Sequence, residues 1–344
     1  MRLFFTLISY VYGFIISIRN LFFDIKIFKS ESFKIPIIGI GNLSIGGTGK
    51  TPHVEYIINL LKIKYNVAVV SRGYGRKNYE LKYVMSDSNA IDVGDEPLQI
   101  KKKHKDILSI VSGSRKKAIK KILNKHKEID VILLDDAFQH RWVNLGLSIL
   151  LTTFDNPFYN DKLLPLGRLR EQIHQSNRAD LIIITKSPKN LDNNQKKIIQ
   201  NHLSKNNEKP IFFSSIRYKK IISYFSHNER EIKTNTSIFL ITGIANSKPL
   251  TDKLKKNIIH HFKFKDHHYF TKNEILNIIS LFSQNNKKEK IILTTEKDML
   301  RIVEYKQILK NIPIFYIPIE INFYNNLEFN NKIINYVEEN KRNC

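Results

Sequence analysis

The sequence predicts an α/β fold of the P-loop NTPase type. We expect a doubly wound parallel sheet (α/β/α), a second, smaller α/β domain and an N-terminal hydrophobic helix. Three observations support this prediction. At residues 35–62 an apolar run typical of a buried strand leads into a glycine-rich loop and then into an amphipathic helix. Further apolar runs alternate with helical patterns along the chain. Residues 3–18 carry no charge.

The glycine-rich loop is the most informative motif. It reads GNLSIGGTGKTP from Gly41 and stands between strand and helix, which is the context of a P-loop. In a P-loop the backbone N–H groups bind phosphates, the lysine reaches the β- and γ-phosphates and the hydroxyl ligates Mg²⁺. The strict pattern has glycine at position 44, where this chain has serine. The residues expected to bind nucleotide are Ser44, Ile45, Gly46, Gly47, Thr48, Gly49, Lys50 and Thr51.

Other apolar runs predict further strands at 67–70, 147–151, 181–185, 238–241, 291–293 and 312–319. A short helix is expected at 332–337. The polar segment 226–235 is typical of a hinge or connector.

Composition limits the possible classes. With 344 residues, about two domains are expected. The formal net charge of +24 invites a nucleic-acid or anionic-membrane interpretation. The basic residues are mostly lysines scattered along the chain, which a compositional bias explains about as well. A single cysteine, Cys344, excludes internal disulfides and fits a reducing compartment.

Arginine is scarce and therefore more informative. Five arginines fall in three short loops, and a guanidinium suits bidentate phosphate recognition. These arginines are Arg72, Arg76, Arg141, Arg168 and Arg170. The first two lie in SRGYGR, directly after a strand, which suits an anion-binding loop or a mere turn. The clusters at 101–103, 115–117 and 120–121 are interpreted as solvated helix faces.

Acidic residues and one histidine in other motifs are further candidates for the site. Residues 130–136 read DVILLDD, a buried strand that delivers a carboxylate to Mg²⁺ beside the P-loop. The sequence does not decide between Asp135 and Asp136 as the direct ligand. In VGDEP, Asp95 is either a helix cap or a base near the phosphates. His267, in DHHYF, is a zinc ligand, a carboxylate-oriented proton-transfer group or a surface histidine.

The N-terminal stretch permits four interpretations. A cleaved signal peptide would need a small-residue cleavage site, which this sequence lacks. A spanning helix usually needs about 18 to 20 uncharged residues, and the run at 3–18 is shorter. A buried core helix is the third. We favour the fourth, a helix in or on the bilayer. Its polar residues form one stripe, expected to face the protein: Thr6, Ser9, Gly13, Ser17, Asn20 and Asp24. Lysines follow at positions 26, 29 and 34.

Taken together, the motifs resemble those of the tetraacyldisaccharide 4'-kinase family, the lipid A 4'-kinases of Gram-negative bacteria. The matching stretches are GNLSIGGTGKTP, SRGYGR, VGDEP, LLDDAFQHR, LLPLGRLRE, TGIA, DHHYF and TTEKD. They occur in family order and cover nearly the whole chain, including the hydrophobic helix. Ser44 also fits the family, whereas Ala137 and the segment 166–168 depart from its usual pattern.

The resemblance implies transfer of the ATP γ-phosphate to the 4'-hydroxyl of lipid A disaccharide 1-phosphate, with Mg²⁺ as cofactor. It also implies two α/β/α domains joined by a two-stranded linker. The expected division is a membrane-associating helix at 1–28, a kinase domain at 29–215, a linker at 216–236 and a smaller domain at 237–344. In this division the last strand and helix of the smaller domain can pack back on the kinase domain.

Residue roles follow from the same resemblance. Lys50 and Thr51 hold phosphate and Mg²⁺, Asp135 and Asp136 form the metal-side carboxylates, and Glu171 lies near the metal. Asp95 matches the proposed base, and His267 the histidine that tunes it. The loop arginines expected to assist the transfer are Arg72, Arg141 and Arg170.

The expected partners are the acylated disaccharide and the membrane surface, at the cytoplasmic face of the inner membrane. We expect a monomer. One alternative is a membrane-associated P-loop switch ATPase that modifies no small molecule. A nucleic-acid-binding NTPase rests on net charge alone, since no recognition helix or stacking motif is evident, so no nucleic acid is expected.

Overall fold

The computed structural model describes residues 2–204 and 209–341. The chain divides into two compact units, described separately here. The first contains residues 1–216 and 321–344, and the second residues 217–320. The chain passes between them within two strands, β8 (Ile211–Tyr218) and β15 (Ile319–Phe323).

A mostly parallel nine-stranded sheet forms the centre of the first unit, in the order β15-β8-β7-β6-β1-β5-β2-β4-β3. Its other strands are β1 (Ile37–Asn42), β2 (Val67–Ser71), β3 (Lys82–Tyr83), β4 (Leu108–Val111), β5 (Val131–Asp135), β6 (Leu147–Thr153) and β7 (Leu181–Thr185). The P-loop strand β1 pairs in parallel with β5 and β6, and Ile40 lies opposite Asp135. Parallel pairing therefore brings the P-loop and the paired aspartates to one sheet edge.

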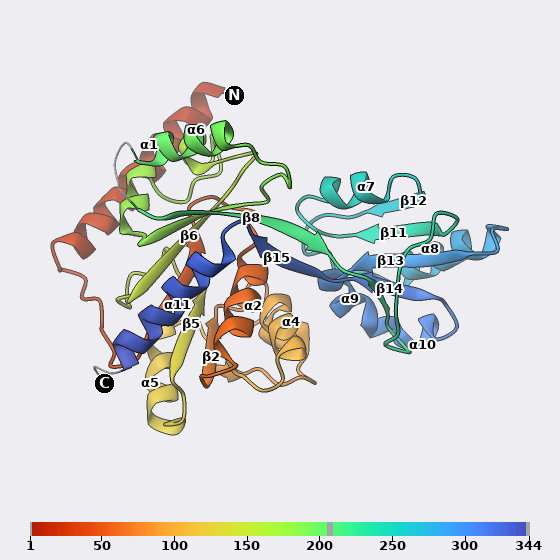
Figure 1. Cartoon of the computed structure of the whole chain (residues 1–344), viewed down its shortest axis with the longest axis horizontal. Helices are drawn as coiled ribbons and strands as arrows, with labels where there is room; N and C mark the ends of the chain where they lie inside the picture. The colour runs from red at the N-terminus through yellow and green to blue at the C-terminus, as the bar shows by residue number, and fades with distance from the viewer. Residues whose placement is uncertain (1, 205–208, 342–344) are drawn as a thin grey trace. The chain divides into compact units, whose positions relative to one another are not determined.

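Helices cover both faces of this sheet (Figure 1). The helices of the unit are α1 (Arg2–Asp24), α2 (Lys50–Leu61), α3 (Ala90–Val93), α4 (Asp95–Lys103), α5 (Arg115–Lys125), α6 (Asn193–Ser204) and α11 (Asn326–Lys341), with 3-10 turns η1 (Phe158–Asn160) and η2 (Ile173–Arg178). Alternate strand residues reach opposite faces, as the period of a strand requires. Ile38 and Ile40 pack with α2 and α11, whereas Ile37 packs in the core that α5 covers. The predicted α/β/α arrangement is confirmed.

Helix α1 packs on the first unit through its polar stripe. Ser9 Oγ donates to the Leu163 carbonyl at 3.0 Å, and Gln172 donates to Ser17 Oγ at 2.8 Å. At Gly13 a Cβ would lie 2.7 Å from the Leu163 side chain. The opposite face is exposed, with Leu7 at 64%. By length and composition, α1 is the one helix in the described part of the chain that could cross a membrane.

The second unit is a smaller α/β domain with a six-stranded sheet in the order β10-β9-β14-β13-β11-β12. Its strands are β9 (Ile221–Ser223), β10 (Glu229–Arg230), β11 (Ser237–Thr242), β12 (Ile258–Lys263), β13 (Lys290–Thr295) and β14 (Ile314–Ile317). Its helices are α7 (Lys248–Leu254), α8 (Lys272–Gln284), α9 (Glu296–Ile302) and α10 (Lys306–Leu309), with the 3-10 turn η3 (Val303–Tyr305). A capping box of Thr271 and Glu274 begins α8.

The C-terminal part of the chain differs from the expectation in two respects. The single strand predicted at 312–319 is wrong, because β14 ends before Pro318 and β15 begins after it in the other sheet. Proline supplies no N–H to a ladder, which suits this break. The helix expected at 332–337 is longer, running through α11. Its Phe329, Ile333 and Val337 are fully buried in the core with β1 and α2.

His53 makes the stability of the first unit sensitive to acid. The ring is 1% exposed, and its nitrogens lie 2.7 Å from the Gly49 carbonyl oxygen and 2.9 Å from Ser214 Oγ. Burial lowers the pKa of His53 to about 4. The unfolded chain takes up this proton near pH 6.5, so the free energy of unfolding should fall between pH 6.5 and 4, by about 3 kcal/mol for this group.

The test is urea unfolding of the wild type and His53→Gln at pH 7 and pH 5. The variant should lose less stability on acidification, although the pKa values of His104 and His140 are lowered in the same way and leave a residual slope. An equal loss in both proteins would contradict the assignment.

Candidate functional site

The P-loop is held in shape by Asn42, the last residue of β1. Its side-chain amide donates to the Ser44 carbonyl at 2.6 Å and to Thr48 Oγ1 at 2.9 Å. Gly49 precedes α2 with φ 86°, a left-handed conformation that favours glycine. Lys50 and Thr51 then begin α2, whose N-terminus can receive an anion.

Asp136 joins the P-loop to two other parts of the site. Lys50 Nζ lies 3.5 Å from Asp136 Oδ1, and the Arg170 guanidinium contacts both carboxylate oxygens at 3.0 and 3.2 Å. Arg170 also donates to the Asn42 carbonyl at 2.8 Å. Burial acts to raise the pKa of Asp136, but Lys50 and Arg170 hold it well below its usual range. Asp136 is therefore a carboxylate at neutral pH.

The neighbouring Asp135 has the opposite electrostatic environment. It is 3% exposed at the end of β5, and burial raises its pKa, with Glu96 and Asp136 acting in the same direction. Its Oδ1 is buried without a hydrogen-bond partner in the described part of the chain. A buried carboxylate with one unbonded oxygen fits a cation, because a cation would compensate the cost of burial.

These residues fit a magnesium ion held together with nucleotide phosphates. Mg²⁺ usually takes one or two carboxylates, and phosphates and water complete its shell. Asp135, Asp136 and the buried Thr51 supply oxygen atoms of the right kind. Within residues 2–204 and 209–341, no group of three or more His, Cys, Asp or Glu residues could hold a metal ion. The same finding gives no support to a zinc site at His267.

Asp95 lies next to the contact between two glycine-containing loops, SRGYGR and VGDEP. A Cβ on Gly73 would lie 2.6 Å from the Val93 carbonyl oxygen, and a Cβ on Gly94 would lie 2.9 Å from the Cα of Gly73. SRGYGR and VGDEP therefore pack backbone against backbone. Asp95 follows as the first residue of α4 and is 3% exposed. Gly94 occupies the cap position, so Asp95 is not the helix cap.

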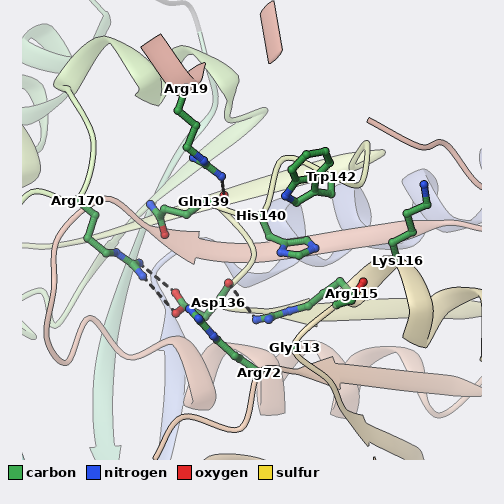
Figure 2. Close-up of a pocket in the computed structure, with 11 residues that line it drawn as sticks. Arg19, Arg72, Gly113, Arg115, Lys116, Asp136, Gln139, His140, Trp142 and Arg170 are labelled. Carbon is green, nitrogen blue, oxygen red and sulfur yellow. Dashed lines mark hydrogen bonds and ion pairs between the residues drawn. The ribbon is translucent and has the colours of Figure 1, made fainter. Parts of the chain in front are cut away.

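A pocket of about 560 Å³ adjoins this network (Figure 2). It is lined by Arg19, Arg72, Gly113, Ser114, Arg115, Lys116, Asp136, Gln139, His140, Trp142 and Arg170. Figure 2 shows Arg115 and Arg170 approaching Asp136 from different sides. Five lining residues are lysine or arginine and one is acidic. This excess of positive charge favours an anionic ligand.

The interpretation of Arg115 as part of a solvated face is wrong. The residue is 2% exposed, and its Nη2 lies 3.2 Å from the Asp135 carbonyl oxygen and 3.4 Å from that of Asp136. Ser114 is the N-cap of α5, and its side chain accepts from the backbone N–H of Lys117, so the helix begins at Arg115. The Arg115 side chain thus reaches the carboxyl end of β5, whereas Lys117 is exposed.

The remaining predicted residues lie outside this centre. Arg141 is not among the described residues that line the pocket, and its guanidinium lies 2.5 Å from Asp24 of α1. Glu171 is 1% exposed and paired with Arg178, while Arg19 Nη1 lies 3.6 Å from its Oε1. Burial raises the pKa of Glu171, and the two arginines oppose this.

His267 belongs to the second unit. Its Nδ1 lies 3.0 Å from Arg301 Nη2 and its Nε2 lies 2.9 Å from Lys297 Nζ. Both ring nitrogens of His267 therefore face cationic side chains of α9. Asp298 of the same TTEKD segment is 1% exposed and accepts from the backbone N–H of Gly243 at 2.9 Å. DHHYF, TGIA and TTEKD therefore form one cluster.

Several pocket residues were not singled out from the sequence. Gln139, His140 and Trp142 lie in the loop that follows Asp135 and Asp136, so their place after this pair was the available signal. Burial and the neighbouring cations Arg115, Arg19 and Arg72 lower the pKa of His140 to about 4. Its Nε2 is buried without a hydrogen-bond partner in the described part of the chain. A neutral histidine therefore faces the pocket.

A P-loop, carboxylates that fit Mg²⁺ and an adjoining cationic pocket define a nucleotide-dependent phosphotransferase. Comparison with known proteins specifies which one. The family model "Tetraacyldisaccharide-1-P 4'-kinase" matches residues 1–338. The chain therefore belongs to the tetraacyldisaccharide 4'-kinase family.

Relatives of known name agree. The chain is 41% identical to the tetraacyldisaccharide 4'-kinase of Bacteroides thetaiotaomicron, over 98% of this chain and 93% of that one. It is 44% identical to that of Flavobacterium psychrophilum, over 97% and 96%. Its fold matches the crystal structure of LpxK from Aquifex aeolicus in complex with ATP, with a TM-score of 0.77 and 25% identity over 98% of this chain and 99% of that one.

The contacts of Arg115 lead to a test of the site. Arg115→Gln removes the buried charge that binds the carbonyl groups of both aspartates, and should lower kcat/KM at least tenfold. The loss of stability should be about 2 kcal/mol. Initial rates of phosphate transfer give kcat/KM, and urea unfolding gives the free energy of unfolding.

Lys117→Gln on the exposed face of α5 is the matched control and should change neither quantity. Activity of Arg115→Gln equal to that of the control would show that Arg115 does not organise the aspartates.

Proposed function

We propose that this protein transfers the γ-phosphate of ATP to the 4'-hydroxyl of an acylated glucosamine disaccharide 1-phosphate. The products are the 4'-phosphorylated lipid, ADP and one proton. The observation that carries this proposal is that the P-loop network and the cationic pocket share two residues, Asp136 and Arg170. A nucleotide phosphate and a second anionic substrate can thus meet at one carboxylate.

The residues divide the chemistry in a way that phosphoryl transfer requires. Lys50 and the backbone of the P-loop bind the phosphates of ATP, and Arg170 adds a second cation beside the γ-phosphate. Bound Mg²⁺ would neutralise charge on the transferred group. Thr51, Asp135 and Asp136 would hold that ion. Glu171, whose Oε1 has no hydrogen-bond partner in the described part of the chain, is the fourth candidate.

The pocket offers a place for the acceptor. Arg19, Arg72 and Arg115 supply positive charge for a phosphorylated sugar, and neutral His140 supplies a hydrogen-bonding nitrogen. Arg115 is buried, so its contacts count more than they would in water. Arg72 also connects the pocket with SRGYGR, the loop packed against the VGDEP backbone.

Asp95 is proposed as the base that accepts the proton of the 4'-hydroxyl. It is the first residue of α4 and is 3% exposed, beside the backbone of SRGYGR. The role expected for His267, keeping Asp95 ionised and oriented, stays a prediction.

Phosphate transfer from γ-labelled ATP to the disaccharide lipid in micelles tests this function. The wild type should give labelled lipid and Lys50→Ala should not. Asp95→Asn should lower kcat roughly a hundredfold or more while ATP affinity stays within about twofold, because a base acts only in the transition state.

The other outcomes are equally informative. ATP hydrolysis without labelled lipid would indicate the switch ATPase instead. Unchanged turnover of Asp95→Asn would remove Asp95 from the mechanism.

We also propose that α1 lies in the surface of the inner membrane, on the cytoplasmic face where ATP is available, and that the protein acts as a monomer. Support comes from the two faces of α1. Leu3, Phe4, Leu7 and Phe14 are 61–86% exposed, whereas Ser9 and Asn20 are buried against the protein. An acylated substrate leaves the bilayer at a high cost, so an enzyme on the bilayer surface is favoured.

Charge on the exposed face should prevent this association. Leu7→Glu combined with Phe14→Glu should lower binding to anionic vesicles at least tenfold, since carboxylates cannot enter the acyl region cheaply. Co-flotation with vesicles measures it. Ile63→Glu, at a site 85% exposed beyond α2, is the control and should float like the wild type. Equal flotation of all three proteins would rule out α1 as the membrane contact.

A further inference from the structure

Arg141 connects the end of α1 to the loop that follows the paired aspartates. Its Nη1 donates to the Asn20 carbonyl at 2.9 Å, and its Nη2 lies 2.5 Å from Asp24 Oδ1. The guanidinium carbon also lies 5.0 Å from the centroid of the Phe23 ring. A cation at a helix C-terminus is favoured by the helix dipole, and the pair with Asp24 is a charge-assisted bond. Arg141 therefore fixes the last turn of α1.

The neighbours of Arg141 are pocket residues. Gln139, His140 and Trp142 all line the pocket, whereas Arg141 itself is not among the described lining residues. The Arg141 side chain leaves the loop toward α1, so its bonds hold the main chain from which His140 and Trp142 project. The Arg141 carbonyl accepts from Ser30 Oγ at 2.5 Å, which adds a second tether just beyond α1.

The same turn of α1 contacts the loop at two further points. Arg19 lines the pocket and donates from Nη2 to the Gln139 carbonyl at 2.8 Å. The rings of Phe23 and Trp142 pack edge to face with centroids 4.9 Å apart. Both ends of the segment 139–142 are thus held by α1, and Arg141 makes the polar contacts between them.

We propose that Arg141 is a positioning residue that sets the affinity of the pocket for the phosphorylated sugar, rather than a group that touches ATP or the acceptor. Its two bonds hold the end of the membrane-facing helix and the pocket loop in one geometry. The inference rests on the proposed role of the pocket as the acceptor site. It also means that α1 acts on acceptor binding and not only on membrane attachment.

The central experiment is the kinetics of Arg141→Gln with the disaccharide lipid in micelles. The KM for lipid should rise about tenfold, while kcat at saturating lipid and the KM for ATP stay within about twofold. This pattern is the signature of lost ground-state binding. Arg141→Lys keeps the charge but not the two-pronged contact, so it should lie between wild type and Arg141→Gln.

Asp24 provides an independent check of the pathway. Asp24→Asn should raise the KM for lipid in the same direction, and combining it with Arg141→Gln should add little to the effect of Arg141→Gln alone, because the two residues act through one contact. Lys64→Gln is the matched control. Lys64 also pairs with a carboxylate, that of Glu338 at 2.5 Å, but away from α1 and the pocket. It should leave all constants unchanged.

The chain offers a direct reporter of the loop, because Trp142 is its only tryptophan. Without any ligand, Arg141→Gln should change the Trp142 emission maximum or its quenching by acrylamide, whereas Lys64→Gln should not. This readout does not depend on kinase activity. If the wild type failed to phosphorylate the lipid, the proposed function would fall, while the fluorescence would still test the coupling of α1 to the loop.

Two results would overturn the inference. A fall in kcat at saturating lipid with an unchanged KM would place Arg141 among the groups that act on the transition state. Wild-type kinetics together with wild-type Trp142 fluorescence in Arg141→Gln would show that the contact with α1 does not shape the pocket.

Discussion

The carboxylate of Asp136 is the interaction on which the rest of the site depends. It lies between Lys50 of the P-loop and Arg170 of the loop before β7, and it stands at the end of the strand that pairs with β1. A partly buried charge is tolerated because two cations neutralise it. Three chain segments far apart in sequence are thereby held together at one carboxylate, and removal of one partner would leave an uncompensated charge for the others.

Positive charge dominates the surroundings of this carboxylate, and its source differs from the charge of the whole chain. The net charge of +24 is spread over many lysines along the whole chain. The pocket instead collects arginines from separate elements, among them Arg19 of α1 and Arg115 of α5. Guanidinium groups tolerate burial better than ammonium groups do, which suits the buried Arg115. Local charge rather than net charge thus defines this binding site.

Strands, helices and motifs were readable from the sequence because each depends on local patterns. The apolar run before Asp135 and the glycines before Lys50 indicate their structure by periodicity and turn chemistry alone. Arg115 was misread because its burial depends on a tertiary contact with the β5 carbonyl groups, which helical spacing cannot reveal. The break at Pro318 was missed for a similar reason, since two adjacent apolar segments belong to different sheets. The orientation of Arg141 toward α1 likewise required the fold.

The position of α11 has a consequence for how the chain is made. Phe329, Ile333 and Val337 complete the core around β1 and α2, yet they follow the whole second unit in the sequence. The second unit, residues 217–320, is continuous in sequence and emerges before them. It can therefore fold during synthesis before α11 is made, whereas the core of the unit that carries the P-loop closes only once α11 is available. The P-loop thus gains its complete supporting core only after the second unit has been made.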